Sequence, residues 1–163
     1  MPANSTSNEQ NDLADEATEA NGPVIVGVDG STNAQRALGV AASLARATNV
    51  DLVVFHALGL MTVINGEHVP SEGHHDQIEL MLRNEWCSVL QGDSSLRWRA
   101  DVVYGSPADV LLDMGRDLHA SFVVVGSRGT GDELLLGSTS NHVVHHCDRT
   151  VVVVPPADRQ THR

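Results

Sequence analysis

The chain has 163 residues, of which 41% are hydrophobic and 19% are charged, and this balance predicts one soluble globular domain. With 10 basic against 21 acidic residues the formal net charge is −11, which excludes bulk electrostatic binding to nucleic acid or to an anionic membrane. Every basic residue is an arginine, so lysine-dependent mechanisms such as a Walker A phosphate site are excluded as well. No apolar run is long enough for a spanning helix or a secretory signal, and two cysteines are too few for a disulfide framework. We therefore expect a cytoplasmic protein with reduced thiols.

The two ends of the chain differ in composition from its middle. Residues 1–22 hold five carboxylates and no basic residue, and they contain few large apolar side chains. Such a segment cannot bury enough apolar surface to offset the entropy of ordering it, so we expect a disordered acidic tail that folding does not require. We place the folded domain at residues 23–156 and a short C-terminal tail at residues 157–163.

Four short runs of the chain are apolar at nearly every position and rich in β-branched residues. They are Val24–Val28, Asp51–Leu58, Phe122–Val125 and Val151–Val154. Continuous apolar strands are typical of a parallel sheet that helices cover on both faces. In Leu96–Tyr104, by contrast, apolar and polar residues alternate over most of the run, which predicts a half-exposed strand at a sheet edge.

Helix starts lie between these strands. Ser31 is a candidate N-cap before apolar residues at helical spacing, and Ser106 followed by Pro107 is a second start, because proline suits the first helical position. Strands and helices thus alternate along the chain. This alternation predicts an α/β fold built on a parallel sheet.

Two further helices are expected, with a loop before the first of them. One has an apolar stripe that consists of Ile78, Met81, Leu82, Trp86, Val89 and Leu90. The other runs from Ser138 to Cys147, with Val143 and Val144 facing inward. The segment Gly59–His75 is rich in glycine and polar residues, and we expect it to be a loop.

Asp29 directly follows the first strand and precedes the first helix. In an open α/β sheet, ligands bind outside the carboxyl ends of the strands, where this residue would lie. Its carboxylate could accept hydrogen bonds from ribose hydroxyls, or it could serve only to cap the helix. The residues alone leave both interpretations open.

A glycine-rich segment follows the strand Phe122–Val125. It runs from Gly126 to Gly131, and Gly137-Ser138 opens a helix shortly afterwards. Glycines let the backbone approach a phosphate closely, a helix N-terminus attracts anions, and Arg128 is the nearest cation. The position of this segment between a buried strand and a helix favours a phosphate site over an ordinary loop.

Five segments together resemble the universal stress protein family. They are Val26–Ser31, Gly105–Ala108, Val125–Gly129, Leu136–Ser138 and Val151–Pro155, and the resemblance covers about residues 23–156. It implies a doubly wound α/β fold with a five-stranded parallel sheet in the order 3-2-1-4-5 and helices on both faces. In this fold Leu96–Tyr104 would be strand three, at the edge.

Many members of this family bind ATP, and the resemblance implies contacts residue by residue. Gly27 and Asp29 would lie beside the nucleoside, and the backbone of Ala57, after His56, would meet the adenine. The ribose and phosphates would be surrounded by Gly126, Ser127, Arg128, Gly129, Thr130, Gly131, Gly137, Ser138 and Thr139. The implied ligand is ATP, or ADP or AMP, with Mg²⁺ as a candidate companion of the phosphates.

The phosphate segment departs from the family pattern in its length. The stretch between Gly129 and Gly137 is two residues shorter than in ATP-binding members, although the glycines and Ser138 are kept at both ends. We therefore expect weaker binding, or a preference for fewer phosphates, rather than a loss of binding.

Histidines gather on the last predicted helix. His142 and His146 have the i, i+4 spacing of a metal pair, but we expect His146 and Cys147 to point in other directions than His142, and no metal site is predicted. A hydrolase triad is not supported, because the sequence has no Gly-x-Ser-x-Gly elbow. No catalytic residue is predicted.

The leading interpretation is a stress-response protein that binds ATP or a related adenine nucleotide and acts as a sensor or regulator. The alternatives are a dimeric interaction protein that binds no nucleotide, and a weak ATP hydrolase. Thr150–Val154 is an uncharged, β-branched strand at the expected sheet edge. We expect it to pair with the same strand of a second chain in a homodimer.

Overall fold

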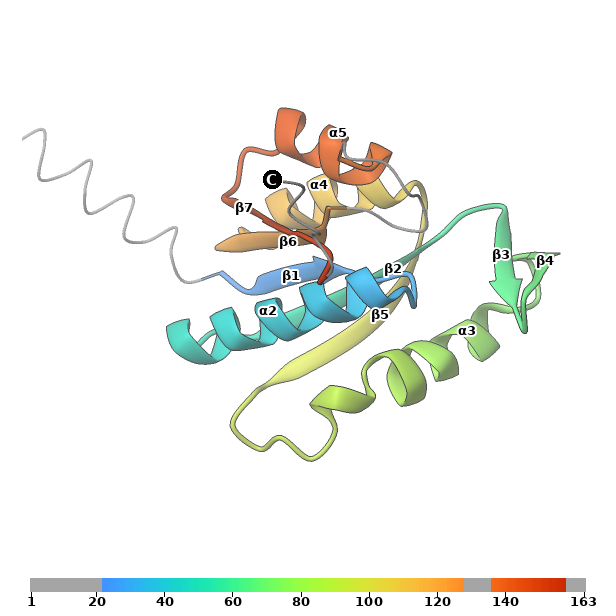
Figure 1. Ribbon diagram of the computed structural model, residues 1–163, viewed down its shortest axis with the longest axis horizontal. Helices are drawn as coiled ribbons and strands as arrows, with labels where there is room; N and C mark the ends of the chain where they lie inside the picture. Colours follow the sequence, from blue (N-terminus) through green and yellow to red (C-terminus); the bar gives the residue numbers. More distant parts are fainter. Residues whose placement is uncertain (1–21, 128–135, 158–163) are drawn as a thin grey trace, which may run out of the picture.

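A parallel sheet runs through the centre of the protein (Figure 1). The computed structural model describes residues 22–127 and 136–157. In this part of the chain the sheet has five strands: β1 (Val24–Gly27), β2 (Leu52–Leu58), β5 (Trp98–Tyr104), β6 (Phe122–Gly126) and β7 (Val151–Val154). They lie in the order β5-β2-β1-β6-β7, and all neighbours are parallel. Counted along the chain this is the order 3-2-1-4-5, so the predicted fold is confirmed, with the alternating segment as edge strand β5.

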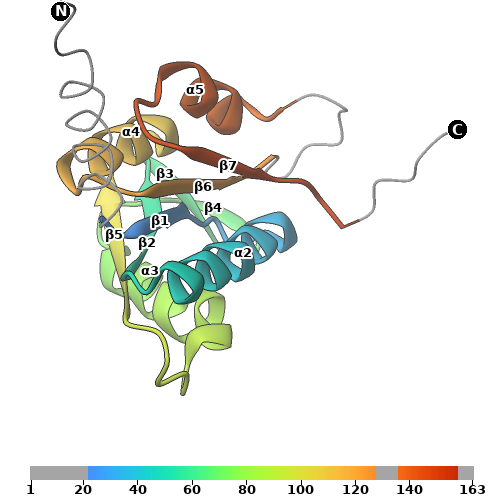
Figure 2. The ribbon, with the colours of Figure 1, turned by 90° about the vertical axis from the view of Figure 1, so that its left-hand side faces the viewer.

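Helices cover both faces of the sheet, and each face has its own core (Figure 2). The helices are α2 (Thr32–Thr48), α3 (His75–Met81), α4 (Pro107–Asp117) and α5 (Ser138–His146). α2 packs on one face, and α4 and α5 pack on the other. Val24 and Val26 belong to the core under α2, while Ile25 belongs to the core under α4. Because successive strand residues face opposite covered sides, the strands are apolar at nearly every position.

Two serines start helices as predicted. The Ser31 hydroxyl accepts a hydrogen bond from the Ala34 backbone N–H at 3.2 Å, and the Ser106 hydroxyl accepts one from the Asp109 N–H at 3.3 Å. Pro107 takes the first position of α4, where its missing N–H costs no hydrogen bond. These caps start α2 and α4 just after the carboxyl ends of β1 and β5.

The helical region after α3 is not one regular helix. α3 continues as a π-helix (Leu82–Trp86) and a short 3₁₀ turn (Ser88–Leu90). The Cys87 N–H donates to the Leu82 carbonyl oxygen at 2.9 Å, five residues back instead of the four of an α-helix. This adds one residue to the turn and rotates the residues that follow about the helix axis. Cys87 is therefore buried and Val89 is 61% exposed, so the prediction that Val89 belongs to the buried stripe is wrong.

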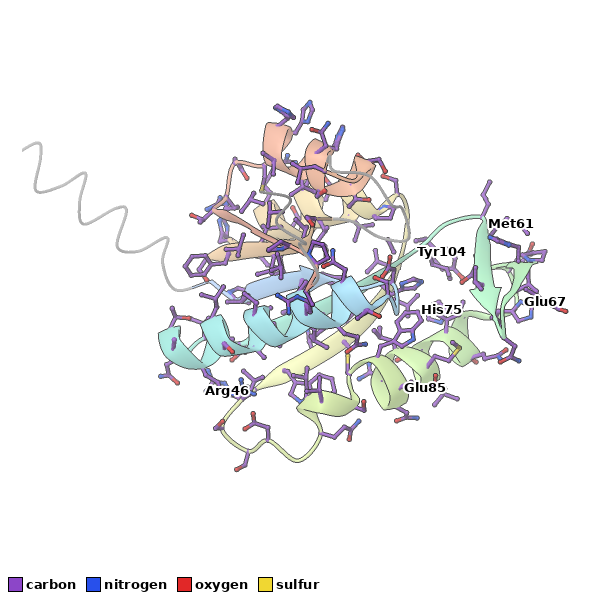
Figure 3. The ribbon with its side chains drawn as sticks, in the orientation of Figure 1. Arg46, Met61, Glu67, His75, Glu85 and Tyr104 are labelled. Atoms are coloured by element: carbon purple, nitrogen blue, oxygen red, sulfur yellow. The ribbon has the colours of Figure 1, made fainter. Side chains whose placement is uncertain are left out.

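The predicted loop over Gly59–His75 is a second error, because this segment contains a β-hairpin. β3 (Met61–Ile64) and β4 (Glu67–Pro70) pair antiparallel around Asn65-Gly66. Both turn residues have positive φ, 53° and 84°, as a type I′ turn requires, and Asn-Gly is the dipeptide that favours this turn. The hairpin stands apart from the main sheet, with Met61 and Glu67 on it (Figure 3).

α5 begins and ends close to the predicted positions, but one of its valines does not face the core. Val143 is fully buried, whereas Val144 is 42% exposed. Adjacent helical residues point about 100° apart, so a narrow buried face holds only one of them. The prediction that both valines face inward is wrong for Val144. His142 and His146 are both exposed and their rings are stacked, with ring centroids 4.2 Å apart, so the expectation that they point in different directions is wrong as well.

The described residues lie almost entirely within the predicted domain 23–156. The predicted acidic tail, apart from Gly22, and the C-terminal tail, apart from Ala157, lie outside them. Among the helices that the structure describes, none is both long enough and apolar enough to cross a bilayer.

The two cysteines should differ sharply in reactivity. Burial raises the pKa of the Cys87 thiol to about 11, while Cys147 is partly exposed. At pH 8 only about one Cys87 in a thousand would be the reactive thiolate. We expect the folded protein to consume one equivalent of an aromatic disulfide reagent at pH 8, and Cys147→Ser to consume none until denaturant is added. Fast reaction of two equivalents in the folded state would contradict this account.

Candidate functional site

A pocket of about 430 Å³ opens at the carboxyl ends of β1, β2 and β6. β1 and β6 are neighbours in the sheet, and the helices that follow them pack on opposite faces. This is the point where the strand order reverses, and open α/β sheets bind their ligands in the crevice that forms there.

Seven of the twelve predicted contact residues lie in the described part of the chain and line this pocket. They are Gly27, Asp29, Ala57, Gly126, Gly137, Ser138 and Thr139. Ser127 is buried and does not line the pocket. The remaining four, Arg128, Gly129, Thr130 and Gly131, lie outside the described residues. The fold thus gathers residues from three strand ends and a helix start into one cavity.

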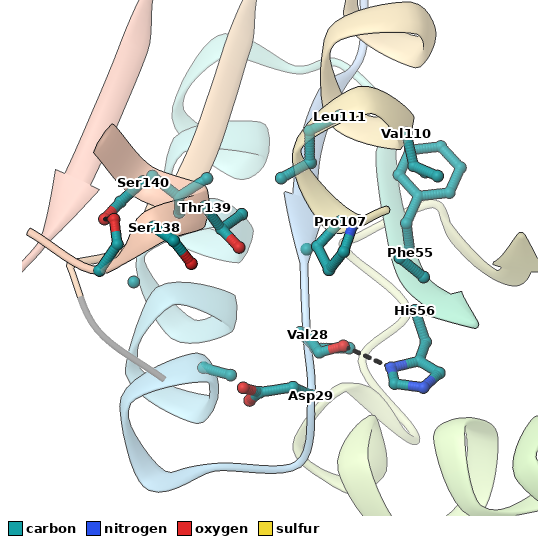
Figure 4. Close-up of a pocket in the computed structure, with 16 residues that line it drawn as sticks. Val28, Asp29, Phe55, His56, Pro107, Val110, Leu111, Ser138, Thr139 and Ser140 are labelled. Atoms are coloured by element: carbon teal, nitrogen blue, oxygen red, sulfur yellow. Dashed lines mark hydrogen bonds between the residues drawn. The ribbon is translucent and has the colours of Figure 1, made fainter. Parts of the chain in front are cut away.

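One wall of the pocket is apolar, and the sequence analysis did not predict it. Pro107, Val110 and Leu111 of α4 form this wall together with Phe55 of β2 (Figure 4). A Cβ atom on Gly27 would come within 3.1 Å of the Leu111 side chain, so glycine lets α4 pack closely on the end of β1. Helical periodicity marks these residues as apolar, but it cannot tell which of them face a cavity rather than the core.

The facing wall is the start of α5 (Figure 4). The first backbone hydrogen bond of α5 runs from the Asn141 N–H to the Gly137 carbonyl oxygen at 2.9 Å, so the N–H groups of Ser138–Ser140 have no partner within the helix. The starts of α2 and α4 reach the same pocket through Ala34 and Pro107. Three helix N-termini of the described chain therefore converge here, and each contributes positive potential.

The described residues that flank positions 128–135 are hydrogen-bonded to each other. The Gly137 N–H donates to the Ser127 carbonyl oxygen at 2.7 Å, and the Ser140 hydroxyl donates to the same oxygen at 2.9 Å. The Ser127 N–H in turn donates to the Val154 carbonyl oxygen of β7 at 2.8 Å. The described residues on either side of positions 128–135 are therefore held close to each other.

Asp29 lies at the pocket and is exposed (Figure 4). Its Oδ1 accepts a hydrogen bond from the Ser31 N–H at 3.0 Å, while Ser31 itself caps α2. Ser31 and not Asp29 is therefore the helix cap, so the capping alternative is wrong, while the Asp29 carboxylate holds the turn before the helix and lines the cavity.

His56 contributes a neutral ring to the pocket wall. Its Nδ1 lies 2.8 Å from the Val28 carbonyl oxygen, and because a carbonyl can only accept, Nδ1 carries the proton (Figure 4). The ring also meets Trp86 edge-on, with ring centroids 4.9 Å apart. Burial lowers the pKa of His56, and this effect exceeds the opposing ones of the Val28 hydrogen bond and the Asp29 charge. The ring is therefore uncharged at neutral pH.

His56 should make folding stability fall on acidification. The pKa of the folded state lies below the ordinary value of 6.5, so from about pH 6.5 downward the unfolded chain takes up a proton that the folded protein resists. The contribution is fully present above pH 6.5 and is lost as the pH falls through the lowered pKa. Urea midpoints measured between pH 7.5 and pH 5 should fall more steeply for the native chain than for His56→Gln. Equal slopes would contradict the assignment.

Relatives of known sequence cover the folded part of this chain. The family model described as the universal stress protein family matches residues 21–155. A universal stress protein of Mycobacterium tuberculosis is 32% identical over 133 residues, which cover 80% of this chain and 44% of the relative. One of Bacillus subtilis is 27% identical over 143 residues and is covered over 97% of its length. The chain thus spans less than half the length of its mycobacterial relatives and nearly all of the Bacillus one.

Solved structures share the fold. A universal stress protein in complex with cAMP superposes with a TM-score of 0.65 at 27% identity, covering 83% of this chain and 98% of the other. The universal stress protein of Archaeoglobus fulgidus in complex with dAMP has a TM-score of 0.62 at 22% identity, covering 83% and 98% of the two chains, and it supports the fold alone. The matched residues and the sheet order together show that the chain belongs to the universal stress protein family.

Proposed function

We propose that the protein binds an adenine nucleotide in the pocket at the carboxyl ends of β1, β2 and β6. The observation that carries the proposal is the contrast between the two pocket walls. One is apolar and suits a base, and the other presents backbone N–H groups that have no partner within their helix. The relative that was solved in complex with cAMP, at 27% identity, supports the same ligand class.

Each part of the nucleotide has a matching group in the pocket. The phosphates lie at the start of α5, near Ser138 and Thr139, where the helix N-terminus stabilises negative charge. The adenine lies against the apolar wall and the backbone of Ala57, and Asp29 accepts hydrogen bonds from the ribose hydroxyls. Asp29 is the one carboxylate among the described residues that line the pocket. Mg²⁺ would therefore be coordinated mainly by the phosphates of ATP.

The role that we propose is that of a sensor or regulator without turnover. The two ionisable side chains among the described lining residues are both engaged with the backbone, Asp29 with the Ser31 N–H and His56 with the Val28 carbonyl. The lowered pKa of His56 makes its free Nε2 a weaker base than that of an ordinary histidine. The runner-up is an interaction protein that binds no nucleotide.

Calorimetry with ATP, ADP and AMP tests this proposal. Asp29→Ala removes the ribose partner, and Gly129→Val adds a side chain where the family motif requires close backbone approach, so both variants should bind more weakly than the native chain. Asp113→Ala is the matched control, because this exposed carboxylate on α4 does not line the pocket. Absence of heat for all three nucleotides at millimolar concentration, with the protein folded, would favour the interaction protein.

We also propose that two chains pair through β7 to form a homodimer. Within the described residues β7 pairs only with β6, and its four residues are all valine. Such an uncharged edge is usually paired or protected in natural proteins. Light scattering should give a dimer, and Val152→Lys should shift it toward the monomer while circular dichroism stays native. A native chain that stays monomeric at micromolar concentration would contradict the proposal.

A further inference from the structure

Trp86 does not line the nucleotide pocket, but its indole contacts two neighbours of the pocket. A Cβ atom on Gly30 would come within 2.8 Å of the indole, so the indole lies directly against this glycine. The indole also meets the ring of His56 edge-on, with ring centroids 4.9 Å apart. His56 lines the pocket, and Gly30 directly follows Asp29, which lines it as well. Trp86 can therefore act on the pocket only through these neighbours.

The turn that the indole contacts is weakly fixed by its own residues. Asp29 and Gly30 are both exposed, and Gly30 has a φ of 80°, which glycine adopts without strain. Within the turn the Ser31 N–H donates to Asp29 Oδ1, but this hydrogen bond is exposed to solvent. A hydrogen bond that water can replace contributes little net stability. The position of the Asp29 carboxylate therefore depends on contacts from neighbouring elements.

Trp86 supplies such contacts on both sides of Asp29. On one side it packs directly against the glycine of the turn. On the other side it packs against His56, whose Nδ1 lies 2.8 Å from the carbonyl oxygen of Val28, the residue before Asp29 (Figure 4). Trp86 is itself anchored, because its carbonyl oxygen accepts a hydrogen bond from the Gln35 side chain near the start of α2 at 3.0 Å. The indole thus links the turn to β2 and α2.

We propose that Trp86 is a positioning residue that holds Asp29 in place for the ribose, and so makes the pocket select nucleotides that carry ribose hydroxyls. The inference rests on the proposed function, because it concerns the same pocket. Trp86 is the last residue of the π-helix, and π-helical turns occur frequently at functional sites. The walls that we assign to the base and the phosphates lie on α4 and α5, away from the indole contacts. Loss of the indole should therefore affect the ribose contact and leave the others intact.

Calorimetry on the full chain with ATP and with 2′,3′-dideoxy-ATP, which lacks both ribose hydroxyls, tests the proposal. The native chain should bind ATP at least about tenfold more tightly than the dideoxy nucleotide, because hydrogen bonds to the charged Asp29 are strong ones. In Trp86→Leu this preference should be largely lost, while the affinity for the dideoxy nucleotide stays nearly unchanged. Trp98→Leu is the matched control. Trp98 is also partly buried, but it lines a cavity at the other end of the sheet, so this variant should keep the preference.

A double substitution tests whether the indole acts through Asp29. In a chain that already carries Asp29→Ala, the further change Trp86→Leu should cost no more ATP affinity, because the ribose partner is gone. Trp86→Phe keeps an aromatic ring at this position and should lose a smaller part of the preference. Circular dichroism shows which variants are folded, and Trp86→Phe carries the test if Trp86→Leu does not fold.

The outcomes separate this inference from the proposed function. A native preference for ATP in the folded Trp86 variants, or an equal loss of affinity for both nucleotides, would overturn the inference and leave nucleotide binding intact. Equal binding of both nucleotides by the native chain would overturn it too, because Asp29 would then not contact the ribose. If neither nucleotide binds the native chain, the proposed function is wrong and the inference is wrong with it.

Discussion

Replacing Ser138 by aspartate should weaken the binding of ATP by at least about tenfold while leaving the binding of adenosine nearly unchanged. Ser138 is the first residue of α5 and lines the pocket where we place the phosphates. Two like charges about 4 Å apart repel by about 4 kcal/mol at an effective dielectric constant of 20, and a third of that energy already corresponds to a factor of ten. Adenosine carries no phosphate and feels little of this repulsion.

The same substitution should not unfold the protein. A carboxylate in the first turn of a helix interacts favourably with the helix dipole, so α5 should be at least as stable as before. Ser138→Asn is the matched control, because it has a similar size and no charge. Calorimetry with ATP and with adenosine on the three proteins separates the effects. Native-like ATP affinity in a folded Ser138→Asp protein would show that the phosphates do not lie at the start of α5.

Truncating Leu38 to alanine should cost about 2–5 kcal/mol of folding stability, the range for buried leucines. Leu38 is fully buried in the core between α2 and the sheet, where the neighbouring alanines leave it as one of the few large side chains of the helix. Because natural domains are stable by only about 5–15 kcal/mol, this loss is a large share of the total. Urea denaturation of the native chain and of Leu38→Ala measures it.

Leu80→Ala serves as the control for this measurement. Leu80 lies in α3 and is 60% exposed, so its truncation should change stability by no more than about 0.5 kcal/mol. Equal losses in the two variants would mean that the core under α2 is not packed as described.

The sheet could be predicted because its strands carry an unambiguous pattern. Both faces of the sheet are buried, so strand residues on either side lie in a core: Ile25 faces one core and Val124 faces the other. Polar side chains are therefore rare in these strands. The serine caps of α2 and α4 could be predicted as well. Capping depends only on local sequence, because the serine hydroxyl accepts a hydrogen bond from the backbone N–H three residues later.

The predictions are wrong where two local signals conflict or where tertiary packing overrides the local pattern. Asn65-Gly66 is itself a strong hairpin signal, but the polar residues around it favoured a loop. The π-helix before Cys87 could not be predicted from periodicity, because a single inserted residue changes which face is buried only from that point onward.

The site was predicted in outline, and its apolar wall was not. Asp29, Gly126 and Ser138 follow strand ends or open a helix, so their positions could be inferred from topology. The contribution of α4 depends on how closely that helix approaches β1, a matter of packing. The acidic tail, the cytoplasmic location and the contacts of the segment from Arg128 to Gly131 stay predictions.

The most direct test of the central claim is a titration of the ¹⁵N-labelled full chain with AMP and ATP, followed by the backbone amide resonances. We expect both nucleotides to shift the amides of Asp29, Ala57 and Gly126, and ATP to shift those of Ser138 and Thr139 more strongly than AMP does. Shifts concentrated instead at the opposite end of the sheet, around Arg97 and Arg99, or no shifts at all, would contradict nucleotide binding in this pocket.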